Sequence, residues 1–76
     1  MHYIKEVEIN RRRAIIDILC KCPGGLRKRE ISSFTGIWVG DLVDVMAEME
    51  DEGIITRTSI RDMANMEFYD IWRLKN

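Results

Sequence analysis

Six carboxylates and no basic side chain lie in the segment from Trp38 to Glu52, WVGDLVDVMAEMEDE. A carboxylate can accept a hydrogen bond from the N4 amino group of cytosine, but nearby phosphate groups repel it. The whole chain has a formal net charge of −1 and this segment carries −6, so the other residues together carry +5. Affinity for a nucleic acid would therefore have to come from residues outside this segment.

The positive charge of the other residues is concentrated in three places. These are Arg11–Arg13, Arg27–Arg29, and the pair Arg57 and Arg61. Basic side chains bind nucleic acids largely by releasing the counterions of phosphate groups. For Arg11–Arg13, which start a predicted helix, we expect exposure to solvent rather than contact with phosphate.

The residue types needed for catalysis or metal binding are scarce. The chain has no glycine-rich loop that could hold phosphates, and its only histidine is His2. Cys20 and Cys22 are the only cysteines; on a helix they point about 200° apart, so they cannot bridge each other. A tetrahedral metal site needs about four ligands. We therefore predict two free thiols, no enzymatic activity, no small-molecule substrate, no metal and no other cofactor.

The length of 76 residues fits a single small domain that spans 1–76. Apolar residues make up 46% of the chain and charged residues 33%, which is typical of a soluble globular protein. No apolar run is long enough to span a membrane, and no signal-peptide pattern is present. We expect a cytoplasmic protein with no membrane partner.

The first helix is predicted from Arg11 to about Lys21, because apolar side chains recur there at helical spacing. Its start has two interpretations. Asn10 is a good N-cap and would leave residues 1–9 as a separate arm or strand, or the helix extends into these residues. Pro23 and the two glycines after it end the helix. If the helix starts early, three side chains opposite its core face favour self-association or a partner surface: Ile9, Ile16 and Cys20.

Two further helices follow. The segment KREISSFT predicts a helix from Lys28 to Thr35 with Ile31 buried, and Gly36 makes the turn after it. The third helix is predicted from about Trp38 to Glu52 and ends at Gly53. Its core face consists of residues at helical spacing, with Trp38 inside the same arc: Leu42, Val45, Met46 and Met49.

Two predicted β-strands complete the chain, IITRTSI at 54–60 and EFYDIWRL at 67–74. The loop 61–66 between them is longer than a tight turn, so the strands form a hairpin with a projecting tip. Met63 and Met66 in this loop are candidates for contact with a partner. The predicted fold class is mainly α with a small β-hairpin, in which three helices precede the hairpin.

The order helix, link, helix, glycine-containing turn, helix and hairpin resembles the winged helix-turn-helix family of DNA-binding proteins. The resemblance covers about Arg11 to Leu74. Its most specific parts are TGI at 35–37, the apolar spacing of the third helix, and GII at 53–55. The two glycines after the first helix, the strand GIITR and the ending IWRL are most similar to the small regulators of fimbrial (pilus) operons.

This resemblance implies a transcriptional regulator of double-stranded DNA, with the third helix in the major groove and the hairpin, the wing, near the backbone or minor groove. It implies contacts to DNA from five basic residues of the second helix and the wing: Arg27, Lys28, Arg29, Arg57 and Arg61. The groove-facing positions that it implies are Trp38, Val39, Gly40, Asp41, Val43 and Asp44. The chain departs from the family here, because none of these six residues is Arg, Lys, Asn or Gln.

The acidic residues of the third helix have two interpretations. Asp41 and Asp44 either accept hydrogen bonds from cytosine or are exposed to solvent, and both interpretations stay open. The remaining carboxylates near the end of the helix are expected to form a solvated face beyond the DNA: Glu48, Asp51 and Glu52.

Trp38 also has two interpretations. It either stacks on a base step or docks on a partner, or it packs at the edge of the core, and packing is the expectation. Because the third helix is acidic, we expect the regulator to act with a partner, either as a homodimer or beside a larger DNA-bound regulator. The alternative function is a protein-interaction module that uses the acidic helix and binds little DNA.

Overall fold

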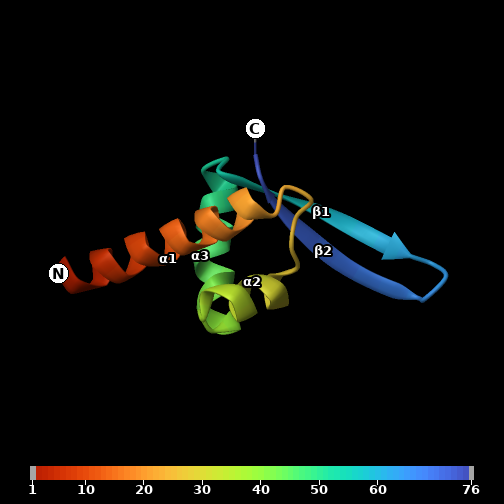
Figure 1. Cartoon of the computed structure of the whole chain (residues 1–76), viewed down its shortest axis with the longest axis horizontal. Helices are drawn as coiled ribbons and strands as arrows, with labels where there is room; N and C mark the ends of the chain where they lie inside the picture. The colour runs from red at the N-terminus through yellow and green to blue at the C-terminus, as the bar shows by residue number, and fades with distance from the viewer. Residues whose placement is uncertain (1, 76) are drawn as a thin grey trace.

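The structure, a computed structural model, describes the backbone of residues 2–75 and the side chains of residues 6–75. Three helices precede an antiparallel hairpin: α1 (His2–Lys21), α2 (Lys28–Thr35), α3 (Val39–Asp51), β1 (Ile55–Asp62) and β2 (Glu67–Leu74). The prediction of a mainly helical chain with a β-hairpin is confirmed. In Figure 1 the start of α1 and the tip of the hairpin lie at opposite ends of the longest axis. None of the helices within residues 2–75 combines the length and apolar character that a membrane crossing requires.

α1 is one continuous helix from His2, so of the two interpretations of its start the helix extension is correct and the N-cap at Asn10 is not. Asn10 lies inside the helix with its side chain exposed. The residues before it include Lys5, Glu6 and Glu8, which are good helix formers and need no break in the chain. Figure 1 shows the first turns of α1 extending beyond α2 and α3.

The link between α1 and α2 is tied to the hairpin. The Leu26 N–H donates to the Trp72 carbonyl at 3.0 Å, and the Trp72 N–H donates to the Leu26 carbonyl at 2.8 Å. Both side chains are buried. Gly25 has a φ of 93°, and a Cβ atom there would fall against the side chain of Ile71. The link thus forms an isolated antiparallel β-bridge with β2 at Leu26.

The close approach of Gly25 to the hairpin gives a first prediction. Gly25→Ala should lower the free energy of unfolding by about 1 to 3 kcal/mol, because alanine is strained at positive φ and its Cβ would lie 2.7 Å from Arg73 Cγ. Gly24→Ala is the matched control, since its added Cβ would meet no atom within 4 Å. Urea unfolding measures both variants. Equal stabilities would contradict the close approach.

α2 and α3 are joined by a tight turn at Gly36, where φ is 76°. The Gly36 N–H donates to the Ser32 carbonyl at 2.9 Å. The Thr35 hydroxyl donates to the Ile31 carbonyl at 2.7 Å and accepts from the Ile37 N–H at 3.2 Å. Both predicted ends of α2 are confirmed, because this turn is specified by local residues.

α3 starts one residue after the predicted position and ends one residue before it. Its end is a Schellman motif, in which the Ile54 N–H donates to the Met49 carbonyl at 2.9 Å. The Gly53 N–H donates to the Glu50 carbonyl at 3.0 Å, and Gly53 has the positive φ of 76° that the motif requires. The motif turns the chain directly into β1.

The core lies between the three helices and the base of the hairpin. Ile16, which was predicted on an exposed stripe with Ile9 and Cys20, packs against this core, so the stripe is interrupted. The predicted core face of α3 and the predicted burial of Ile31 are confirmed. The buried residues are Ile15, Leu19, Leu26, Ile31, Leu42, Val45, Met46, Met49, Ile55 and Trp72.

The hairpin pairs in register from Ile55 opposite Leu74 to Asp62 opposite Glu67. β1 runs further than predicted, so the connecting turn is only residues 63–66. Asn65 closes this turn by donating to Asp62 from its backbone at 3.2 Å and its side chain at 2.8 Å. Residues directly opposite each other share one side of the sheet. One side, which we call the arginine face, therefore carries Arg57, Ser59, Arg61, Phe68, Asp70 and Trp72.

Candidate functional site

The six carboxylates of the acidic segment lie on three sides of α3. By helical spacing, one flank carries Asp41, Glu48 and Glu52, and the opposite flank carries Glu50. Asp44 and Asp51 project outward between the two flanks. α1 supplies the arginines that pair with the first flank, and the hairpin supplies the arginine that pairs with the opposite flank.

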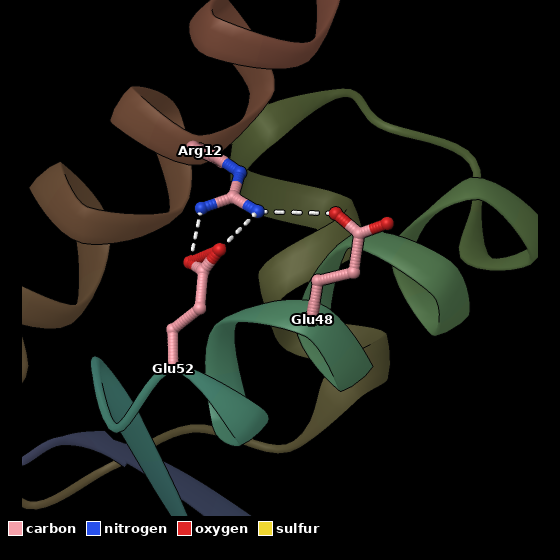
Figure 2. A network of polar contacts seen from close by, with 3 residues as sticks. All are labelled: Arg12, Glu48 and Glu52. Atoms are coloured by element: carbon pink, nitrogen blue, oxygen red, sulfur yellow. Dashed lines mark hydrogen bonds and ion pairs between the residues drawn. The ribbon is translucent and has the colours of Figure 1, made fainter.

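Arg12 of α1 joins the first flank at the end of α3 (Figure 2). Its Nη2 donates to Glu48 at 3.0 Å and to Glu52 at 3.1 Å, and its Nη1 also donates to Glu52. The hydrogen bond to Glu52, and then that to Glu48, raises the pKa of the Arg12 guanidinium. The same bond from Arg12 lowers the pKa of the Glu52 carboxyl. Nearer the start of α3, Arg11 donates to Asp41 at 3.2 Å.

The Arg12 bridge gives a pH-dependent prediction. Because Arg12 lowers the folded-state pKa of Glu52 below its ordinary value of 4.5, the bond stabilises the protein fully above that value. This contribution is lost as the pH falls through the folded-state pKa. Arg12→Ala should therefore lower the melting temperature near pH ~7 and have little effect near pH ~2. Arg13→Ala is the control, because Arg13 is exposed and has no carboxylate partner among residues 6–75. An equal loss at both pH values would contradict the bridge.

Glu48 and Glu52 are exposed, as predicted, and both also bind Arg12. The expectation that Arg11–Arg13 are exposed to solvent holds for Arg13 only, because Arg11 and Arg12 are partly buried and bind carboxylates of α3. Asp41 is half-buried and paired with Arg11, so it is not simply exposed to solvent, and its contact with cytosine stays a prediction. Asp51 is exposed, as predicted.

The opposite flank of α3 faces the hairpin. Glu50 lies 3.7 Å from Arg57, whose guanidinium also lies 3.9 Å from Asp70. Four of the six carboxylates in the acidic segment thus have an arginine partner. Within the described side chains, Asp44 and Asp51 have none and are exposed on the outer surface of α3.

Trp38 lies on this outer surface with 73% of its side chain area exposed. It is the N-cap residue of α3, and its φ of −60° and ψ of 139° are extended rather than helical. Its ring lies over Gly40, where a Cβ atom would overlap the ring. The expectation that Trp38 packs at the core edge is wrong, because a helical arc does not describe a residue with extended backbone. Val39 and Val43 beside it are 40% and 47% exposed.

A groove of about 430 Å³ separates the acidic flank of α3 from α1. Its apolar lining comes from Val7 of α1 and Val45 of α3. Asp44 lies at the edge that this groove shares with the outer surface of α3. The charged lining is mainly acidic: Glu8, Asp41, Asp44 and Glu48, with Arg11.

Three of the predicted basic residues lie over two aromatic rings of β2, and strand alternation puts these two rings on opposite sides of the sheet. The Arg27 guanidinium lies 3.7 Å from the centre of the Tyr69 ring. Lys28 Nζ and the Arg57 guanidinium lie 5.4 Å and 5.6 Å from the centre of the Trp72 ring. Such cation–π contacts hold cations in place, and two of these cations also have a carboxylate partner, since Arg27 lies 3.8 Å from Glu67 and Arg57 lies 3.7 Å from Glu50. We call Arg27, Lys28 and Arg57 the aromatic-supported cluster.

The other two predicted basic residues extend this cluster in different directions. Arg29 is exposed and lines a hollow of about 500 Å³ at the start of α2, together with Arg27, Glu30 and Ser33. Arg61 is exposed on the arginine face, opposite Phe68 and nearer the tip of the hairpin. These five residues, which we call the basic path, do not share one side of the hairpin: Arg57 and Arg61 are on the arginine face, whereas Arg27 lies over Tyr69 on the other side.

No protein-family model matches this chain, and no curated protein matches its sequence at a significant level. The candidate site therefore depends on the geometry described above. Sequence reasoning missed Tyr69 and Trp72 as supports for cations, because these contacts join residues distant in the chain. The alternation of β2 could have placed Phe68 on the same side as Trp72, and Phe68 is 64% exposed.

The two thiols are unbridged, as predicted, with Cys20 exposed and Cys22 half-buried. Across residues 6–75, no three side chains that could bind a metal ion come together. The surfaces that remain for binding are the basic path and the outer surface of α3.

Proposed function

We propose that this chain is a winged helix-turn-helix transcriptional regulator that binds double-stranded DNA in the cytoplasm and acts with a partner. In this proposal α2, the turn at Gly36 and α3 form the helix-turn-helix, and β1 and β2 form the wing. The observed order of three helices and a hairpin supports the proposal. The start of α2 and the wing bind the DNA backbone.

The observation that carries this proposal is the aromatic-supported cluster. It places Lys28 and Arg57, from two distant segments, against the ring of Trp72, with Arg27 nearby over Tyr69. Arg29 and Arg61 add two further exposed cations. Basic side chains such as these bind phosphates, and each contact releases counterions.

The paired carboxylates explain how an acidic α3 is compatible with DNA nearby. The arginines of α1 and the wing offset most of its charge at short range, which weakens the repulsion of phosphates. α3 offers no basic or amide side chain that could donate to a base edge. α3 therefore contributes little affinity, and a partner is needed for a stable, specific complex.

Fluorescence anisotropy tests this proposal with two labelled duplexes of unrelated sequence. Both should bind with similar affinity, and log K should fall linearly with log salt concentration, with a slope of about −3 to −5 for three to five phosphate contacts. If neither duplex binds at low salt, the proposal is wrong.

A second candidate function is a protein-interaction module that binds little DNA. The exposed ring of Trp38 favours it, because aromatic side chains are common anchors in protein interfaces. The same duplex measurement distinguishes the two functions, since this module would show no salt-dependent binding of DNA.

A further inference from the structure

We infer that the outer surface of α3 around Trp38 docks a basic amphipathic helix of a second protein. This inference gives the chemistry of the partner that the proposed function requires, and it rests on that function only for the need of a partner. Three features support it: the packing of Trp38 against Gly40, the separation of apolar and acidic side chains near the start of α3, and the negative charge of α3.

The ring of Trp38 packs against Gly40 and is otherwise largely open. It occupies the space where a larger residue at position 40 would have its Cβ atom. The 73% exposure of Trp38 is the largest among the exposed large apolar residues within 6–75. An exposed aromatic ring of this kind suits an interface anchor.

Near the start of α3, apolar and acidic groups lie on different sides of this surface. Val39 and Val43 extend the apolar area of Trp38 along one side of α3. The other side carries Asp44 and leads into the acidic groove against α1. A helix with apolar residues on one side and Lys or Arg beside them would match both areas at once.

The charge of α3 argues against the two other occupants. DNA would bring phosphates toward Asp44 and Asp51, which have no arginine partner among the described side chains. A second copy docked through the same surface would bring two acidic helices together, and like charges across an interface disfavour binding. A basic protein segment would cause neither of these charge repulsions.

Tryptophan fluorescence tests the inference on the intact chain, because Trp38 is exposed whereas Trp72 is only 4% exposed. The probe is a synthetic amphipathic helix of leucine and lysine that contains no aromatic residue. It should shift the emission to shorter wavelength and reduce acrylamide quenching about twofold or more as it covers Trp38. The same peptide with glutamate in place of lysine should have no effect.

Two variants test whether peptide binding depends on the ring of Trp38. The affinity is measured by anisotropy of the fluorescein-labelled peptide. Trp38→Ala should weaken binding about tenfold or more. Gly40→Ala should weaken it as well, because the new Cβ displaces the ring, while helicity is kept since alanine favours helices. Gly24→Ala is the matched control and should bind as the parent does, because its added Cβ meets no atom within 4 Å.

Each other outcome overturns the inference. Protection of Trp38 by a bound duplex would show that α3 faces DNA, and protection that grows with protein concentration alone would identify a second copy. If the leucine and lysine peptide does not bind, or if Trp38→Ala binds it equally well, this surface does not dock a basic amphipathic helix through Trp38. If the duplexes do not bind at all, the proposed DNA binding fails, but the peptide result still decides the docking surface.

Discussion

We expect Met46→Ala to lower the free energy of unfolding by about 2 to 5 kcal/mol, because it removes a buried side chain and leaves a cavity. Met46 has 0% exposure on the core face of α3. A loss of this size is a large part of the stability of a small domain. Urea unfolding followed by circular dichroism measures the change.

Met63→Ala is the matched control for this substitution. Met63 lies in the turn of the hairpin and is 66% exposed. The same chemical change there should alter the free energy of unfolding by less than about 0.5 kcal/mol. A loss below about 0.5 kcal/mol for Met46→Ala itself would show that the core face of α3 is assigned incorrectly.

The second large effect concerns DNA. Replacing Arg57 and Arg61 together with alanine should weaken binding to every duplex alike, by about tenfold or more at low salt. The slope of log K against log salt should become less steep by about 2, because each lost phosphate contact contributes about 0.9. Anisotropy titrations at several salt concentrations measure both quantities.

A control for this pair removes two positive charges from α1. Arg13 and Lys21 are both exposed there, and their double alanine variant should keep most of the affinity and the salt slope. Equal weakening by the two double variants would mean that binding follows the net charge and not the basic path. Weakening at only one sequence would mean that Arg57 and Arg61 read bases.

The parts of the fold that local residues specify were predicted well. Gly36 and Gly53 take left-handed backbone conformations that end α2 and α3 near the predicted positions. The spacing of apolar residues in α3 identified the buried side chains, because these residues all lie on one face of the helix. The start of α1 was not predicted, since Asn10 suits an N-cap as a residue type but the neighbouring residues continue the helix.

The candidate site was predicted less completely, because its decisive contacts join distant residues. Arg12 lies 36 and 40 positions from the two glutamates that it binds, so no periodicity in the sequence relates them. The orientation of Trp38 depends on its extended backbone and on the missing Cβ atom of Gly40. The basic residues themselves were recognisable by type and grouping, but their aromatic supports were not.

The bridge between Leu26 and Trp72 also affects the order in which the protein can assemble. It closes a long stretch of chain, whereas each helix forms from contacts within a few residues. The helices can thus form early, but Lys28 reaches Trp72 and Arg27 reaches Tyr69 only after β2 has met the link. Fraying of β2 would disperse the cations while the helices persist. Amide protons of Leu26 and Trp72, exchanging with deuterium in heavy water, report this opening directly.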